Sequence, residues 1–187
     1  MPKAKPDPLA TIDRLRPLIT ADEIRQRTRE MGAKVSADYK GKDLLLVSVL
    51  KGGFVFLADL VRTITIPLEI DFMRVRSYGA RTESSGVVEI TADLTAPVEG
   101  KHVLFVEDIV DTGLTMTYLM RNIRTRHPAD VKLCSLLYKP DRKLVDVPIE
   151  YLGFTIPNQF VVGYGLDYDE KHRNLPYIAT MDDEPPT

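Results

Sequence analysis

The sequence contains no tryptophan, a single cysteine, little net charge and no long apolar run. Because Cys134 is the only cysteine, no intrachain disulfide can form, and the apolar residues around it favour a buried position in a strand over a reactive thiol. The formal net charge of −2 provides no overall basic field to hold nucleic acid or an anionic membrane non-specifically. We therefore expect no nucleic-acid partner and no membrane partner.

Purely apolar stretches are also short, and none resembles a targeting or membrane segment. Runs such as 44–47 and 54–57 are far shorter than the roughly 18 to 20 residues that a membrane span requires. The first ten residues, MPKAKPDPLA, alternate proline and charge and lack the apolar core of a signal peptide. We expect no transmembrane helix and a cytoplasmic location.

What the sequence does contain is enough apolar residues for one core. A chain of 187 residues with 44% hydrophobic content has the usual size of one globular domain. We expect a single domain over 1–187, with flexible ends at 1–10 and 181–187, where the terminal MDDEPPT has too little apolar surface to fold.

Helical and strand patterns alternate along the first three quarters of the chain. Thr20 and Glu23 form a capping-box pattern that predicts a helix over 21–38. Further along, the patterns predict strands at 44–50, 66–78, 102–108 and 131–139, and helices at 54–62 and 112–126. This order is typical of an α/β fold with a doubly wound, mostly parallel sheet.

Two stretches do not fit that alternation. The polar segment 79–86 has glycine at both ends and is expected to form a mobile surface loop. The last third, with short aromatic segments from Tyr151 to Thr180, is expected to form largely a small flap, or hood, over the edge of the sheet.

Three carboxylates stand together where the strand over 102–108 is predicted to end: Glu107, Asp108 and Asp111. One interpretation makes the last of them a helix N-cap and leaves the other two in a solvated loop. Like charges repel, however, and so many acids after so apolar a strand favour a site with a cationic partner. The turn from Asp111 to Thr115 offers glycine, hydroxyls and backbone N–H groups that suit a phosphate.

Two other phosphate-handling classes fit this segment less well. A Walker B strand requires a G-x-x-x-x-G-K-[ST] loop, which is absent from the chain. A phospho-aspartate motif of the haloacid dehalogenase type needs two acids two residues apart, whereas Asp108 and Asp111 are three apart. A ribose phosphate with Mg²⁺ explains acids beside a phosphate cradle better.

The segment VLFVEDIVDTGLT, residues 103–115, resembles the phosphoribosyl pyrophosphate motif of type I phosphoribosyltransferases. Three more segments, 50–53, 76–78 and 160–167 with Arg173, narrow the resemblance to the hypoxanthine-guanine phosphoribosyltransferase family, over about Ala21 to Ile178. The resemblance implies purine salvage: transfer of the phosphoribosyl group to N9 of hypoxanthine or guanine, with release of pyrophosphate. It also implies Mg²⁺ as cofactor and a homo-oligomer, either a dimer or a tetramer.

By this resemblance, Asp111 acts as the catalytic base near N7 of the purine. Glu107 and Asp108 hold the ribose hydroxyls and a metal ion, and the turn after them binds the 5′-phosphate. Leu114 stands at a variable position and lacks a basic group. The substrate-binding residues implied for this motif are Glu107, Asp108, Ile109, Val110, Asp111, Thr112, Gly113, Leu114 and Thr115.

The pyrophosphate side of the site is implied to lie at Lys51 and Gly52, with a cis peptide between Leu50 and Lys51 as a family feature. Asp167 resembles a second magnesium contact, and Arg173 a pyrophosphate contact. Without the resemblance, the glycine-rich segment at 51–53 is an ordinary turn, and Asp167 and Arg173 are an ordinary surface ion pair.

The purine side is implied to use Lys139, Phe160 and Val161. A lysine that donates to O6 selects 6-oxopurines, because the 6-amino group of adenine cannot accept that hydrogen bond. Phe160 would stack on the base, and the backbone of Val161 would meet its 2-position, although Phe-Val-Val is also an ordinary core strand. Ser77 and Tyr78 resemble the start of a lid that excludes water.

Two other functions stay open from the sequence. A regulator with this fold would bind the donor as a signal and control RNA or DNA, but such proteins usually need an added nucleic-acid surface. A xanthine-guanine specificity would depend on contacts near the purine 2-position that the sequence does not fix.

Overall fold

The computed structural model describes residues 15–78 and 87–181. The expected flexibility of 1–10 and 182–187 and the expected loop at 79–86 lie outside these described residues, whereas Met181 is the last residue of a strand. All statements below concern the described part of the chain.

A six-stranded sheet forms the centre of the molecule, in the order β4-β3-β2-β5-β6-β7. All neighbouring strands are parallel except β3 and β4, which pair in antiparallel fashion. The predicted mostly parallel, doubly wound sheet is therefore confirmed. Its strands are β2 (Leu44–Leu50), β3 (Glu69–Tyr78), β4 (Val87–Ala92), β5 (His102–Val110), β6 (Asp130–Tyr138) and β7 (Tyr151–Thr155).

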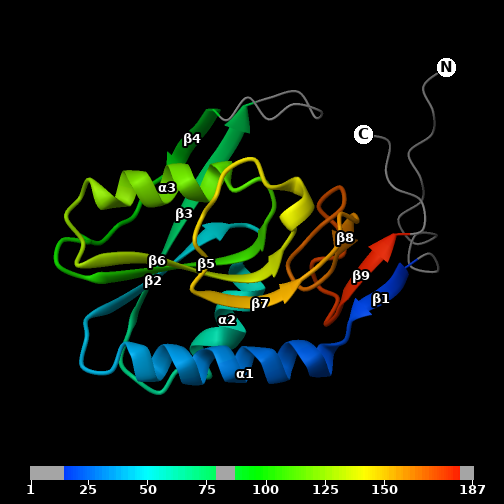
Figure 1. The fold of residues 1–187 in the computed structure, drawn as a ribbon, viewed down its shortest axis with the longest axis horizontal. Coiled ribbons are helices and arrows are strands. Elements are labelled where there is room, and N and C mark those ends of the chain that lie inside the picture. Colours follow the sequence, from blue (N-terminus) through cyan, green and yellow to red (C-terminus); the bar gives the residue numbers. More distant parts are fainter. Residues whose placement is uncertain (1–14, 79–86, 182–187) are drawn as a thin grey trace.

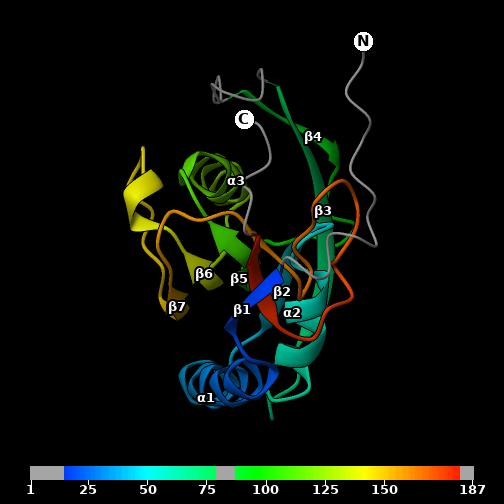
Figure 2. The same cartoon turned by 90° about the vertical axis from the view of Figure 1, so that its right-hand side faces the viewer.

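Helices cover both faces of this sheet, as Figures 1 and 2 show. Helices α1 (Ala21–Asp38) and α2 (Phe54–Val61) lie on one face, and α3 (Leu114–Arg124) lies on the other. Helix α1 begins at the predicted capping box, in which Thr20 Oγ1 accepts from Glu23 N and Glu23 Oε2 accepts from Thr20 N. None of the described helices is both long and apolar enough to cross a membrane.

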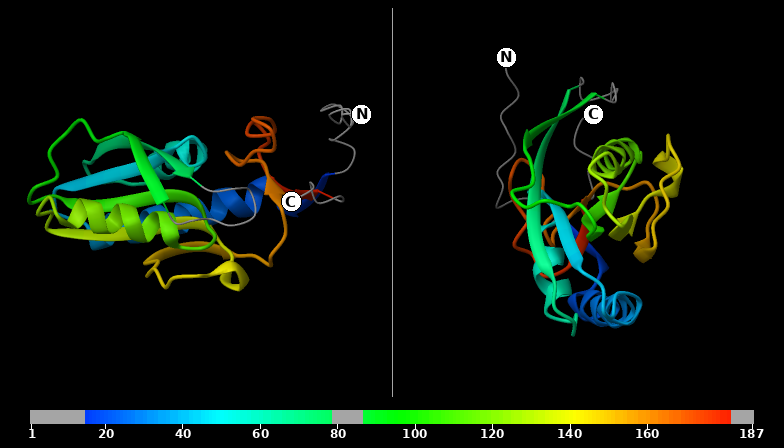
Figure 3. Two further views of the ribbon diagram at one scale, coloured as in Figure 1. Left: turned by 90° about the horizontal axis from the view of Figure 1, so that it is seen from above. Right: turned by 90° about the vertical axis from the view of Figure 1, so that its left-hand side faces the viewer.

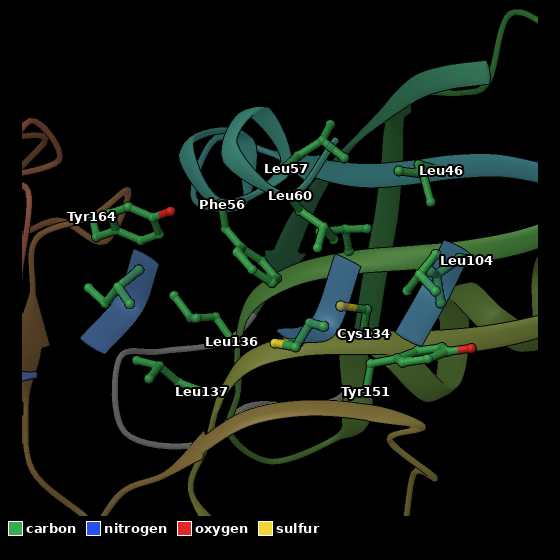
Figure 4. Close-up of a cluster of buried hydrophobic side chains, with 14 of the residues drawn as sticks. Leu46, Phe56, Leu57, Leu60, Leu104, Cys134, Leu136, Leu137, Tyr151 and Tyr164 are labelled. Carbon is green, nitrogen blue, oxygen red and sulfur yellow. The ribbon is translucent and has the colours of Figure 1, made fainter. Parts of the chain in front are cut away.

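The nearly all-apolar sequence of β2 follows from burial on both faces. Leu44 and Leu46 belong to the core under α1 and α2, whereas Leu45 and Val47 belong to the core under α3. In the first core, shown in Figure 4, Phe56 from α2 packs near Cys134 of β6. Cys134 is fully buried, and burial raises the pKa of its thiol, which confirms the expected structural role.

A second, three-stranded sheet lies at one end of the molecule and corresponds to the predicted hood (Figure 3, left). It consists of β1 (Leu15–Ile19), β9 (Ile178–Met181) and β8 (Val161–Val162), in that order. The prediction gave the hood largely to the C-terminal third, and two details differ. Strand β7 joins the central sheet as its edge, and β1 comes from the N-terminal part of the chain to pair with β9.

Tyr164 fixes the hood segment to the central domain. Its ring is buried in the core under α2 (Figure 4). Its hydroxyl donates to Asp59 Oδ2 at 2.7 Å. Asp59 lies in α2, so the chain segment after β8 is attached to the helix that follows β2. This attachment holds the hood close to the carboxyl end of β2.

Candidate active site

The carboxyl ends of β2, β5 and β6 meet the hood around a cavity of about 540 Å³. In doubly wound sheets, ligands bind at this end of the strands. Of the residues implied by the sequence, eleven line the cavity: Lys51, Gly52, Glu107, Asp108, Ile109, Asp111, Lys139, Phe160, Val161, Asp167 and Arg173. The others on its wall are Val49, Leu50, Arg142 and Leu166.

Glu107 and Asp108 lie within β5 and not at its end, because the strand continues beyond the predicted end to Val110. Ile109 and Val110 extend the ladder to β6 by pairing with Leu137 and Tyr138. Burial raises the pKa of Glu107 well above its ordinary range, and repulsion by Asp108 raises it further. Burial also raises the pKa of Asp108.

One oxygen of this pair, Glu107 Oε2, is buried without a hydrogen-bond partner. An unsatisfied buried carboxylate oxygen is costly unless a cation or a donor reaches it. The pair therefore fits a divalent cation that binds through one or two carboxylates and completes its shell with substrate oxygens and water, as Mg²⁺ does. Among the described residues, no three His, Cys, Asp or Glu side chains are grouped closely enough to hold one ion, so Asp167 does not join this pair.

Asp111 lies in the turn between β5 and α3. The helix N-cap is Gly113, with φ of 81°, so the interpretation of Asp111 as the N-cap is wrong. Its carboxylate instead pairs with Arg142, with 3.1 Å between Asp111 Oδ1 and Arg142 Nε. Both side chains are partly exposed, so this carboxylate lies on the cavity wall within reach of a substrate.

Arg142 reaches this position because the segment after β6 folds over the turn. Residues Pro140–Arg142 form a short 3-10 helix, and the following backbone N–H groups of Leu144 and Val145 both donate to Thr112 O. The sequence did not predict this residue. A basic side chain three residues after Lys139 was visible, but its contact with the turn depends on how the loop folds.

The turn after β2 carries Lys51 and Gly52, and the cis peptide expected between Leu50 and Lys51 is present. Gly52 lies so close to Asp108 that a β-carbon would overlap with the Oδ2 atom of that carboxylate. A β-carbon on Gly165 of the hood would likewise overlap with the carbonyl oxygen of Gly52. Glycine is therefore required at Gly165, where φ is 101° and the close atom is main-chain, whereas a side chain at Gly52 would displace the Asp108 carboxylate.

Four charged side chains form a network in which the Lys51–Glu170 pair connects this turn to the hood. Arg173 pairs with Asp167 at 2.7 Å and donates from Nη1 to Gly165 O at 2.7 Å. Lys51 Nζ donates to Glu170 Oε2 at 2.7 Å, and this hydrogen bond lowers the pKa of Glu170. Sequence reasoning missed Glu170, which stands between two residues that it did identify.

Lys139, Phe160 and Val161 form the other end of the cavity. Lys139 follows β6, is only 8% exposed, and its backbone N–H donates to Val110 O at 3.0 Å. Phe160 comes directly before β8 and packs edge-on against Tyr168, with 5.9 Å between ring centroids. A nearly buried lysine and an aromatic residue on the wall of one cavity suit a flat, polar heterocycle.

Five further implied residues are not among the described residues that line the cavity. Val110, Thr112, Gly113, Leu114 and Thr115 form the end of β5, the adjoining turn and the first residues of α3. Ser77 and Tyr78 end β3, and their side chains lie outside the described part of the chain.

Comparisons with known proteins all indicate the same family. The phosphoribosyl transferase domain matches residues 20–169. The hypoxanthine-guanine phosphoribosyltransferase of Mycobacterium avium is 51% identical over 171 residues, which cover 88% of this chain and 84% of the relative.

Two solved structures agree with this assignment. The hypoxanthine phosphoribosyltransferase of Staphylococcus aureus superposes with a TM-score of 0.89 at 43% identity, covering 92% of this chain and 94% of that chain. A Trypanosoma cruzi hypoxanthine phosphoribosyl transferase, solved to address the role of its C-terminal region in oligomeric state and enzymatic activity, has a TM-score of 0.84 at 43% identity, covering 89% of this chain and 90% of that chain. With its cavity at the carboxyl ends of β2, β5 and β6, the chain belongs to the phosphoribosyltransferase family, among the hypoxanthine-guanine phosphoribosyltransferases.

Proposed function

We propose that the protein transfers the 5-phosphoribosyl group of phosphoribosyl pyrophosphate to N9 of hypoxanthine or guanine, which gives IMP or GMP and pyrophosphate. One observation carries this proposal. One cavity combines a buried acid pair, a carboxylate before a helix start, the cations Lys51 and Arg173, and the nearly buried Lys139. The relatives named hypoxanthine-guanine phosphoribosyltransferase support the same activity.

In this proposal, Asp111 accepts a proton from the purine while N9 attacks C1 of the ribose and the bond to pyrophosphate breaks. Proton transfer by a positioned carboxylate is a standard contribution to such reactions. The turn from Asp111 to Thr115 binds the 5′-phosphate through its backbone N–H groups and hydroxyls. Glu107 and Asp108 hold the ribose hydroxyls and favour the positive charge that develops on the sugar ring.

Mg²⁺ is part of the proposal, and when bound it neutralises charge on the pyrophosphate and orients it as a leaving group. Glu107 and Asp108 would hold the ion at the ribose, which is supported by the partnerless oxygen of Glu107. Asp167 would contact a second ion. Lys51 and Arg173 would bind the pyrophosphate, since both provide N–H donors on the cavity wall.

Lys139 would donate to O6 of the purine, and Phe160 would stack on the ring. The backbone of Val161 would meet the 2-position, which allows either a hydrogen or an amino group there. Ser77 and Tyr78 would begin the lid that excludes water, because water would otherwise hydrolyse the donor.

Steady-state rates with phosphoribosyl pyrophosphate and each of hypoxanthine, guanine, xanthine and adenine test the proposal. We expect turnover of hypoxanthine and guanine, little turnover of adenine, and loss of activity when EDTA removes Mg²⁺. Efficient use of xanthine and guanine with little use of hypoxanthine would favour the xanthine-guanine alternative. No turnover of any purine would contradict the proposal.

We further propose that the protein forms a dimer or a tetramer in solution and is located in the cytoplasm. The oligomer is supported by a groove of about 770 Å³ beside α1 and α2, where Phe54 is 44% exposed. Exposed apolar surface of this kind often marks an interface between proteins. Light scattering should give a mass of two or four times the 21.1 kDa chain, and a monomeric mass would contradict the oligomer.

A further inference from the structure

Two cations from different parts of the chain share one carboxylate oxygen. Lys51 Nζ lies 2.7 Å from Glu170 Oε2, and Arg173 Nη2 lies 3.5 Å from the same atom. Lys51 follows β2, whereas Glu170 and Arg173 belong to the hood segment between β8 and β9. An anionic oxygen between these two cations is the environment that an oxygen of pyrophosphate would need.

The backbone holds Glu170 in this place. Asp169 and Glu170 both have positive φ, 50° and 65°, which is uncommon for residues other than glycine. The N–H of Glu170 donates to Asp167 Oδ2 at 2.8 Å, and Tyr168 and Lys171 exchange backbone hydrogen bonds across the turn. A non-glycine turn in this conformation persists only where its surroundings determine it, and such turns concentrate at functional sites.

Exposure differs among the four charged side chains, and the difference allows a ligand to replace the Glu170 carboxylate. The Asp167 and Arg173 side chains are 29% and 19% exposed, whereas Glu170 is 65% exposed and Lys51 is 50% exposed. Glu170 can therefore leave Lys51 and enter water at little cost, because exposed ion pairs are weak. Arg173 would keep its Asp167 partner and its hydrogen bond to Gly165 O.

We propose, on the basis of the proposed function, that Glu170 is a positioning residue that takes the place of a pyrophosphate oxygen in the empty enzyme. Its carboxylate holds Lys51 and Arg173 in position and competes with pyrophosphate for both. Binding of pyrophosphate, or of the pyrophosphate group of the donor, displaces Glu170 into solvent. The return of Glu170 to Lys51 then favours release of the pyrophosphate product.

The variant Glu170→Gln tests this competition, because it removes the charge and preserves the size of the side chain. We expect calorimetry with inorganic pyrophosphate and Mg²⁺ to give a Kd about two- to fivefold lower than that of the wild type, the range expected when a weak competing ion pair is lost. The KM for the donor should fall in parallel, and the KM for guanine should not change. A purely structural role would not separate these two KM values.

Glu30→Gln is the matched control. Glu30 pairs with Arg27 on the surface of α1 at 2.9 Å, so the variant makes the same chemical change and breaks the same type of pair away from the cavity. It should bind pyrophosphate like the wild type. A Glu170→Asp variant retains the charge with a shorter reach and should lie between Glu170→Gln and the wild type.

Unchanged or weaker binding of pyrophosphate by Glu170→Gln, with a normal Glu30→Gln control, would overturn the inference. If the wild type turns over hypoxanthine in the same experiments, the proposed function stands without this role for Glu170. A wild type that neither binds pyrophosphate nor turns over a purine would overturn both.

Discussion

Replacing Asp111 with asparagine should lower kcat about 1000-fold, within the range of roughly 10² to 10⁴ that general acid–base catalysis contributes. Asparagine has nearly the same size, so the shape of the cavity is preserved while the proton acceptor is lost. Binding of the donor should change only slightly, because the backbone N–H groups of the turn from Asp111 to Thr115 and the cations Lys51 and Arg173 would still bind it. Single-turnover rates and calorimetric titration with phosphoribosyl pyrophosphate measure these two effects separately.

The same substitution at Asp146 provides the control. Asp146 pairs with Lys143 on the segment after β6, close in sequence to Arg142, but it does not line the cavity. Asp146→Asn should therefore have wild-type kcat. Loss of the Asp111–Arg142 pair should itself cost little stability, because both side chains are partly exposed and such ion pairs are weak. A near-wild-type kcat in Asp111→Asn would remove Asp111 from the role of base.

Lys139→Ala should lower kcat/KM for hypoxanthine and guanine about 100-fold and leave the low rate with adenine unchanged. A hydrogen bond to a charged donor is worth roughly 1.5–3 kcal/mol, and its loss leaves the purine oxygen unpaired in a buried place. Adenine has no acceptor at this position and so gains nothing from the lysine. The ratio of the two kcat/KM values is the quantity to compare between wild type and variant.

Lys143→Ala is the corresponding control, since Lys143 lies four residues further along and pairs with Asp146 outside the cavity. Thermal unfolding of both variants should be measured, because Lys139 is nearly buried whereas Lys143 is partly exposed. An equal loss of activity with adenine and with hypoxanthine would indicate a general effect and would contradict the assigned role in purine selection.

Local signals were sufficient to predict much of the central sheet and its helices. The bounds of α1 agree with the prediction because the capping box at Thr20 and Glu23 acts within one turn. The bounds of β2 also agree, since six successive buried positions leave few alternatives to an inner strand. By contrast, β1 contains a proline and pairs with β9, so Leu15 lies opposite Met181. No pattern within five residues specifies a partner so distant in sequence.

The site was predictable where its residues are neighbours in sequence. Glu107, Asp108 and Asp111 are held by one strand and one turn, and their grouping follows from the motif alone. Arg142 and Glu170 were missed because each meets its partner through a loop that folds back over the cavity. The sequence also could not show that α3 begins at Leu114, with Gly113 as its N-cap, instead of at the predicted Thr112.

The contact between Gly165 and Gly52 has a consequence for how the two substrates are spaced. Gly165, in the same hood segment as Phe160 and Val161, approaches Gly52 of the Lys51 turn through main-chain atoms, with no side chain between these two residues. Rotamers cannot adjust this separation as they adjust an ordinary packed interface. The backbone therefore sets the distance between the purine end and the pyrophosphate end of the cavity. Side chains of the hood can vary in sequence, and the choice of purine can vary with them. The attacking nitrogen of the purine still reaches the ribose.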